Sequence, residues 1–332
     1  MVLSILLILA GCGSTDSSSG SNADDKDAKV IKFATVSTKD QPITEGIYKF
    51  AEIVEKETNG NIKVEVYTDG QLGGDLDVIS GLKAGTIQAS NISTAPLAAT
   101  FPKLNAFDLP FLFENYENAY KVLDGEIGKD ILEEFKNEGL VGLGYWENGF
   151  RFLTNNTKPV DSVDDLKGMK IRTMENELHL AIWKELGTNP TPLAFTELFT
   201  ALEQKVVDGQ ENSLSNTRFN KFYEVQKYFT DTKHVYSPSI QLISAKFWDG
   251  LSSEEQEILQ KASDEARDYQ RELSQKNDED SIKFLEEEGG MEIINLTSGE
   301  REKFIEKVQP VYKKYSKELG EDFVQKLLEE AK

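Results

Sequence analysis

The sequence is poor in cysteine, histidine and positive charge, and each shortage excludes a class of function. A single cysteine, Cys12, can form neither an internal disulfide nor a zinc site built on cysteines. Two histidines, His179 and His234, are too few for most metal centres and histidine-based catalytic sites. The 37 Lys and Arg residues face 58 Asp and Glu residues, which gives a net charge of −21. A chain this acidic repels nucleic acid, so we expect no nucleic-acid partner.

Long hydrophobic runs are also absent, because the apolar run at the N-terminus is too short to cross a bilayer and no later one is apolar enough. Residues 1–11 match the hydrophobic region of a signal peptide. The run ends in Leu9, Ala10, Gly11 and Cys12, which resemble a bacterial lipobox and imply cleavage before Cys12 and acylation of its thiol. Residues 12–28 are rich in Ser, Gly and Asp and predict a flexible tether. We therefore expect the body outside the cell membrane, attached through a lipid on Cys12.

From residue 30 onward, strand-like and helix-like segments alternate, which favours an α/β fold. Strands are expected over residues 30–37, 62–68, 86–93, 140–148, 169–173 and 234–244. Helices are expected over residues 43–58, 75–85, 115–138, 175–186 and 196–207. Asp75 and Thr196 are placed to cap two of these helices. The length of 332 residues suggests two domains.

The least ordinary segment begins with Ser252 and Glu255, which form a capping box. Helix-forming residues continue without Gly or Pro to Glu288, enough for about 55 Å of helix at about 1.5 Å per residue. That length exceeds the width of either expected domain. We predict one helix lying across both domains, with a break at residues 275–280 as the alternative.

Three polar residues are candidates for binding an anion. Arg151 follows the strand 140–148, Arg172 lies in the strand 169–173, and Asn212 follows an Asp-Gly turn. A guanidinium presents a planar fork of donors that matches a carboxylate, and an amide adds a donor and an acceptor. Each residue also has a purely structural interpretation: a solvated turn for Arg151, the solvent face of a strand for Arg172, and an Asx turn for Asn212.

Two further candidates have alternative interpretations. Phe195 precedes a helix and is either a core aromatic or the apolar wall of a pocket. Asp75 is either a helix cap or an acceptor for ligand hydroxyl groups. His179 lies on a helix between leucines and is expected to be structural. No phosphate-loop, serine-hydrolase or metalloprotease motif and no identifiable catalytic carboxylate pair occurs, so we expect no cofactor and no metal.

Four motifs follow one another in the second half of the sequence: LKGMKIR at 166–172, NPTPLAFTEL at 189–198, VDGQEN at 207–212 and FYEVQKY at 222–228. Together they resemble the solute-binding proteins of tripartite ATP-independent periplasmic (TRAP) transporters, DctP type, over about residues 30–325. The resemblance implies a periplasmic-binding-protein-like α/β fold, a hinged clamshell of two domains with a long helix spanning both. We assign residues 29–148 plus 237–276 to domain I and residues 149–236 plus 277–332 to domain II.

The resemblance also implies a role for each candidate in the second domain. The arginine matched by Arg172 pairs with the ligand carboxylate, and the one matched by Arg151 adds a second contact. The asparagine matched by Asn212 hydrogen-bonds the same group, and the phenylalanine matched by Phe195 packs on the ligand.

The first-domain contacts differ from those of the family's sialic-acid binders. Ser93 stands where those proteins carry an acidic residue, and Val36 where they carry an asparagine, so sialic acid is not expected. Asp75 remains available to hold a ligand hydroxyl. A sugar acid (a uronate or keto-sugar acid) and a C4-dicarboxylate both stay open, with a slight preference for the sugar acid.

The predicted function is therefore that of a receptor and not an enzyme. We expect a monomeric, lipid-anchored protein that binds a small organic carboxylate, closes on it and delivers it to the membrane subunits of a TRAP permease. The alternatives are an extracellular hydrolase of acidic sugars and a ligand sensor that uses the same fold.

Overall fold

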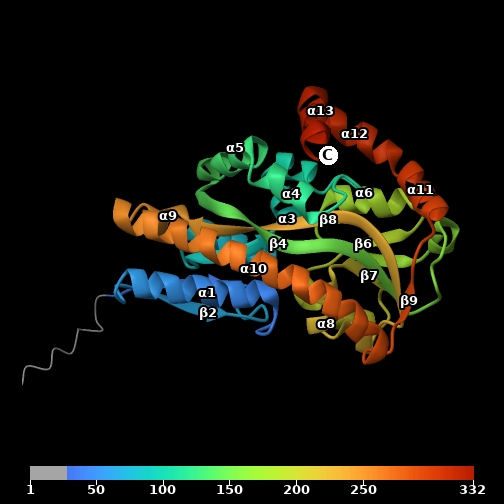
Figure 1. Ribbon diagram of the computed structural model, residues 1–332, viewed down its shortest axis with the longest axis horizontal. Helices are drawn as coiled ribbons and strands as arrows, with labels where there is room; N and C mark the ends of the chain where they lie inside the picture. The colour runs from blue at the N-terminus through green and yellow to red at the C-terminus, as the bar shows by residue number, and fades with distance from the viewer. Residues whose placement is uncertain (1–27) are drawn as a thin grey trace, which may run out of the picture.

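A mixed sheet forms the centre of the protein, whose computed structural model describes residues 28–332 (Figure 1). The predicted signal peptide (residues 1–11), Cys12 and the predicted tether up to residue 27 lie outside the described residues. The strands run in the order β2-β1-β3-β8-β4-β7-β5-β6, and β9 pairs with β8. Their bounds are β1 Lys29–Ala34, β2 Ile62–Tyr67, β3 Ala89–Ser93, β4 Leu140–Asn155, β5 Lys170–Thr173, β6 Asn189–Pro192, β7 Gly209–Asn212, β8 Tyr228–Ser244 and β9 Glu292–Ile294.

Helices connect these strands and follow them at the C-terminus. The α-helices are α1 Pro42–Glu57, α2 Asp75–Ala84, α3 Thr94–Leu97, α4 Tyr116–Leu123, α5 Glu126–Glu134, α6 Glu177–Glu185, α7 Phe195–Glu203, α8 Leu214–Phe219, α9 Ala245–Trp248, α10 Ser253–Glu287, α11 Ser298–Lys307, α12 Gln309–Leu319 and α13 Glu321–Glu330. Four short 3₁₀ helices are η1 Pro102–Ala106, η2 Phe135–Glu138, η3 Val163–Leu166 and η4 Phe222–Glu224. The predicted alternation of strands and helices is confirmed.

The sheet has two halves that share only the two long strands β4 and β8. The first half contains β1, β2 and β3 with residues 140–147 of β4 and 238–244 of β8. The second half contains β5, β6, β7 and β9 with residues 149–155 of β4 and 228–237 of β8. Pairing among β1, β2 and β3, and among β5, β6 and β7, is parallel, whereas β4 and β8 run antiparallel.

Both long strands extend further than the sequence predicts. β4 continues to Asn155 instead of ending at residue 148, and β8 begins at Tyr228 instead of residue 234. Gly149, at φ +107°, lies at a register shift of β4 against β8 that begins at Glu147. Such a bulge bends a strand without ending it, so the predicted strand end at residue 148 is instead the passage between the two halves. Arg151 therefore lies inside β4 and not after it.

The long helix α10 crosses both halves as one uninterrupted element (Figure 1). It packs against α1 in the first half and α8 in the second. Ser252 and Glu255 form the predicted capping box, the predicted single helix is confirmed, and the alternative, a break at residues 275–280, is wrong. Gln270 holds the backbone of Glu147 from α10: its Oε1 accepts the N–H (2.9 Å) and its Nε2 donates to the C=O (2.8 Å). The helix is thus fixed to β4 where the sheet passes from one half to the other.

Apolar side chains pack on both faces of the sheet. Phe33, Phe50, Trp146 and Leu259 belong to a buried cluster beneath α1 and α10. A larger cluster on the remaining elements extends from Val78 through the strands to the C-terminal helices. Along β4, β8 and α10, the two halves are therefore joined by continuous packing.

Two predicted helix caps are wrong. The N-cap of α2 is Gly74, whose N–H donates to the carboxylate of Asp77 (3.1 Å), so Asp75 is the first helical residue and its side chain is free of capping. Helix α7 begins at Phe195, one residue before the Thr196 that was expected to cap it. The cap lies one residue before the predicted one in α2 and two residues before it in α7, where it is Ala194, and short-range sequence signals rarely resolve such shifts.

We predict that Ser252→Ala lowers the free energy of unfolding by about 1 kcal/mol, because the hydroxyl that accepts the Glu255 N–H is lost. Urea denaturation measures the change. Ser253→Ala, one residue into the helix, is the matched control; equal effects of both substitutions would contradict the capping role.

Candidate functional site

A cavity that is partly open to solvent lies between the two halves, and the space among its lining residues, solvent included, is about 540 Å³. It is lined by Val36, Ser37, Ile43, Asp75, Asn91, Ser93, Pro96, Asn148, Arg151, Arg172, Met174, Glu175, Phe195, Asn212, Asn216 and Ser239. All five residues that the sequence singled out, Asp75, Arg151, Arg172, Phe195 and Asn212, are among them. The fold therefore brings into one space residues that lie far apart in the chain.

Arg172 is a buried cation without a carboxylate partner. Its side chain is 1% exposed, and its Nε and Nη2 both donate to the backbone C=O of Leu193 (3.0 and 2.7 Å). Its Nη1 is buried and has no hydrogen-bond partner among the described residues. Burial lowers the pKa of Arg172 to about 10. The interpretation of Arg172 as a solvent-facing residue is thus wrong, and its free N–H groups need an acceptor from outside the chain.

Phe195 and β5 position this guanidinium. The centre of the Arg172 guanidinium lies 6.0 Å from the centroid of the Phe195 ring, within range of a cation–π contact. Phe195 in turn packs edge-to-face on Phe222, with the ring centroids 5.9 Å apart. Phe195 is half-buried and reaches both the cavity and a small apolar cluster, so its two interpretations from the sequence are compatible.

Arg151 is buried too, but its charge is already paired. Its Nε donates to Oε2 of Glu211 (2.5 Å), and its Nη2 donates to Oε1 (2.8 Å) and to the backbone C=O (2.6 Å) of the same residue. Burial acts to raise the pKa of Glu211, but Arg151 outweighs it and the pKa is held well below its usual range. The solvated-turn interpretation of Arg151 is wrong, and its bidentate partner, Glu211, was not identified from the sequence.

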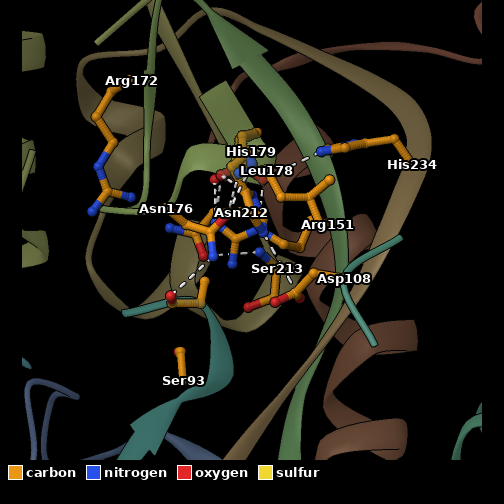
Figure 2. A network of polar contacts seen from close by, with 12 residues as sticks. Ser93, Asp108, Arg151, Arg172, Asn176, Leu178, His179, Asn212, Ser213 and His234 are labelled. Carbon is orange, nitrogen blue, oxygen red and sulfur yellow. Dashed lines mark hydrogen bonds and ion pairs between the residues drawn. The ribbon is translucent and has the colours of Figure 1, made fainter. Parts of the chain in front are cut away.

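Glu211 is the centre of a larger buried network, drawn in Figure 2. Besides Arg151, it faces Nε2 of His234 (3.2 Å) and Nδ1 of His179 (3.7 Å). Nε2 of His179 faces Asp108 (3.8 Å). These residues come from β4, β7, α6, β8 and the segment after η1, and Arg172 stands apart from them in the view. We call Asp108, Arg151, His179, Glu211 and His234 the charged support of the cavity. His179, which was expected to be structural, belongs to it.

A chain of side-chain amides crosses from Asn212 to the first half. Oδ1 of Asn212 accepts from the N–H of Ser213 (3.0 Å) and from Nδ2 of Asn216 (2.8 Å). Asn216 also donates to Asn148 (3.1 Å), which donates to the hydroxyl of Ser93 (3.0 Å). Because the oxygen of Asn212 is occupied, its Nδ2 is the group left to face the cavity.

The first-half wall of the cavity is polar but carries no basic residue. Asn91 and Ser239 are buried, and neither amide atom of Asn91 nor the hydroxyl of Ser239 has a partner among the described residues. Each buried polar atom left unpaired costs about 1–3 kcal/mol, so these atoms are suited to hydrogen-bond a guest molecule. Neither residue stood out in the sequence, because a polar residue within a strand carries no signal of what it faces.

Two carboxyl groups face Arg172 from opposite halves. Burial raises the pKa of Asp75 to about 7, while Arg172 lowers it and Glu175 raises it further. Burial also raises the pKa of Glu175. The cavity is therefore cationic at Arg172 and weakly acidic at its opposite wall.

Residues 28–332 hold no group of three or more His, Cys, Asp and Glu side chains arranged to bind a metal ion. Within the same range, no helix combines the length and the apolarity needed to span a membrane.

Comparison with known proteins places this arrangement in a family. A family model described as "Bacterial extracellular solute-binding protein, family 7" matches residues 33–318. The chain is 36% identical to the C4-dicarboxylate-binding periplasmic protein DctP of Rhodobacter capsulatus over 89% of each protein. It is 38% identical to the 2,3-diketo-L-gulonate-binding periplasmic protein YiaO of Escherichia coli, over 74% of this chain and 75% of that protein.

Solved structures with the same fold hold different organic acids. The sugar acid binding protein DctPAm of Advenella mimigardefordensis, in complex with galactonate, superposes with a TM-score of 0.90 at 41% identity over 92% of this chain and 98% of that one. A TRAP periplasmic solute binding protein of Sulfurospirillum deleyianum with bound succinate gives 0.86 at 33% identity, over 90% and 98%. The predicted two-domain periplasmic-binding-protein-like fold is confirmed.

We predict that Glu211→Gln lowers the free energy of unfolding by about 3–5 kcal/mol, because it leaves the Arg151 guanidinium buried without its counter-charge. Chemical denaturation at neutral pH measures the loss. Glu203→Gln, on the exposed face of α7, is the control and should change stability by less than about 0.5 kcal/mol. Equal stabilities of the two variants would show that the buried pair contributes nothing.

Proposed function

The chain belongs to the family 7 bacterial extracellular solute-binding proteins, the receptors of TRAP transporters, and from this premise we propose that it captures a hydroxylated monocarboxylate, a sugar acid, for a TRAP permease. The family consists of extracytoplasmic receptors for small organic acids rather than of enzymes. One observation carries the proposal: Arg172 is a buried cation that lines the cavity, and among residues 28–332 its Nη1 has no hydrogen-bond partner and its guanidinium no carboxylate partner.

The carboxylate of the ligand is bound at the second-half wall. Nη1 of Arg172 donates to one oxygen, and Nδ2 of Asn212 provides a further donor. Arg151 contributes its charge from β4, held in place by Glu211. Phe195 covers the apolar side of the bound acid. A desolvated guanidinium binds a carboxylate strongly enough here to overcome the repulsion from a chain of charge −21.

The tail of the ligand is a polyol and not a second carboxylate. The first-half wall offers unpaired Asn91 and Ser239 and the carboxyl of Asp75, which together donate to and accept from hydroxyl groups. No Lys, Arg or His lines that wall, so a second carboxylate there would lose its hydration without gaining a counter-charge. Relatives bound to galactonate and D-erythronate support this choice over the succinate bound by others.

Ligand binding closes the protein about the passage between the halves. The domains are residues 29–148 plus 237–276 and residues 149–236 plus 277–332, with the hinge in β4, β8 and α10. A ligand that contacts both walls favours the closed state by its differential affinity for that state. The closed monomer, anchored to the membrane through a lipid on Cys12, then delivers the acid to the permease, whose energy source is an ion gradient.

A hydrolase of acidic sugars and a ligand sensor are the competing functions. The hydrolase would convert uronate conjugates, so a turnover assay accompanies the binding screen. The sensor would lack a permease partner, and two membrane-protein genes beside this gene would argue for transport.

A thermal-shift screen over aldonates, uronates, keto-acids and dicarboxylates tests the proposal. A ligand at 100 times its dissociation constant adds about 2.7 kcal/mol of stability. Stabilisation by a sugar acid with no turnover is the expected result. Stabilisation only by dicarboxylates would refute the assignment of a polyol tail to the ligand. Hydrolysis of uronate conjugates would refute the receptor role.

We predict that Arg172→Ala weakens binding of galactonate by about 2–5 kcal/mol, as for a lost partner of a buried charge. Arg172→Lys should also fail, because an ammonium cannot both bind the Leu193 carbonyl with two N–H groups and present a third to the ligand. Isothermal titration calorimetry measures both. Arg267→Lys on α10 is the control and should retain affinity, because Arg267 pairs with Asp264 and Asp268 and does not line the cavity.

We predict that Asp75→Asn weakens galactonate binding by about 1.5–3 kcal/mol, the value of a hydrogen bond to a charged group. The ratio of the affinities for galactonate and succinate should decrease as a result. Because the pKa of Asp75 is raised to about 7, the native protein should discriminate against succinate more strongly above that pH, where the carboxylate is ionised, than below it. Competition titrations at pH 6 and 8 measure the ratio. The control is Asp130→Asn on α5, and an unchanged ratio in Asp75→Asn would exclude Asp75 from ligand selection.

A further inference from the structure

His179 lies buried between two carboxylates that belong to different parts of the chain. Its Nδ1 is 3.7 Å from Oε1 of Glu211 and its Nε2 is 3.8 Å from Oδ1 of Asp108. All three side chains are 0% exposed. These are ion-pair distances, and neither ring nitrogen has a hydrogen-bond partner among the described residues.

This geometry selects the doubly protonated ring. A neutral imidazole carries one N–H and one lone pair, so one of the two carboxylates would face a lone pair. An imidazolium presents an N–H to each. Burial alone would lower the pKa of His179, but Asp108 and Glu211 outweigh burial and raise it to about 9.

His234, the other histidine, has a different environment and serves as an internal contrast. Its Nδ1 lies 2.8 Å from the hydroxyl of Thr232, and only its Nε2 faces Glu211, at 3.2 Å. A neutral ring satisfies both contacts, with the hydroxyl donating to Nδ1 and Nε2–H donating to the carboxylate. Burial lowers the pKa of His234.

The charge of His179 decides the balance beneath the cavity. Asp108 and Glu211 carry two negative charges, and Arg151 supplies one positive charge. With a neutral His179 the support is net negative, and the positive charge of Arg172 is cancelled for an approaching anion. With an imidazolium the support is neutral, and Arg172 acts undiminished on the ligand.

The network also links the two halves. Asp108 accepts from the hydroxyl of Thr94 (3.2 Å), which also donates to the C=O of Pro238 (3.2 Å) on β8. Thr94 directly follows Ser93 of the cavity wall. An imidazolium therefore holds Glu211 of the second half, and with it Arg151, to a segment anchored in the first half.

We propose that His179, kept as an imidazolium between Asp108 and Glu211, is a positioning residue for anion capture that offsets their charge and holds Glu211 against Arg151. The role rests on the proposed function, since it acts through the arginines that receive the ligand carboxylate. Asp75 and Glu175 also face Arg172 and titrate separately from this network.

The first arm of the test needs no ligand. A chain with two histidines gives two imidazole signals in nitrogen-15 NMR, and His179→Gln assigns them. We expect the His179 ring of the full protein to be doubly protonated at pH 7 and to titrate near pH 9, while His234 stays neutral. A neutral His179 at pH 7 would overturn the proposal.

The second arm measures galactonate affinity from pH 6 to 10. An anion favours the charged ring, so the native affinity should rise as Asp75 ionises near pH 7, hold from about pH 8 to 9, and fall up to about tenfold per unit above about pH 9. His179→Gln should bind at least about tenfold more weakly at pH 7, with the fall above pH 9 abolished. His234→Gln, which replaces one neutral side chain by another, should keep the fall.

The outcomes separate the two proposals. A folded His179→Gln protein with native affinity and an unchanged pH profile would contradict the positioning role and leave the receptor function standing. A native protein that binds no sugar acid at any pH would refute the receptor function and the role with it. If His179→Gln fails to fold, Asp108→Asn carries the test: it should lower the pKa of His179 and move the fall in affinity to lower pH, and an unmoved profile would overturn the proposal.

Discussion

Arg172 is a buried cation at the wall of the cavity. No carboxylate of the described residues is bonded to its guanidinium. Removing an ion from water costs several kcal/mol, and the C=O of Leu193 offsets part of that cost without supplying a full opposite charge. The remaining deficit is what an organic anion can satisfy. Arg151 shows the contrast, because Glu211 neutralises it with a bidentate pair. One guanidinium is thus kept available, and the other is fixed beside it as part of the support.

The scaffold explains how this state can open and close. Only β4, β8 and α10 run continuously through both halves, and Gln270 joins the last of these to the bulge at Glu147. Around the cavity the halves meet through a few polar bonds, such as Asn216 to Asn148 and Asn176 to the C=O of Ala95. Hydrogen bonds of this kind exchange readily with water, whereas the packed strands and helix do not. Opening would therefore break these polar contacts around the cavity.

The large negative charge of the chain and the capture of an anion are compatible because they act at different distances. Most acidic side chains lie on exposed helix faces, where solvent and salt screen their field within about 10 Å. Arg172 acts inside a cavity in which screening is weak. Glu211 of the buried network is bonded to Arg151 of the cavity wall, so the charge balance of Asp108, His179 and Glu211 matters more to an anion in the cavity than the total charge of −21.

Local patterns in the sequence determined the α/β alternation, the long capped helix after Ser252 and the residue types suited to an organic anion. Those features depend on neighbours within a few residues. The order of the motifs between residues 166 and 228 further indicated the family. The tertiary structure alone decided that Arg151 lies inside a bulged strand, that Glu211 neutralises it, and that Asn91 and Ser239 face the cavity unpaired. Which charges are buried together, and which polar atoms are left without partners, depends on contacts between segments far apart in the chain. No local pattern encodes those contacts, because burial and pairing are properties of the folded packing and not of sequence spacing.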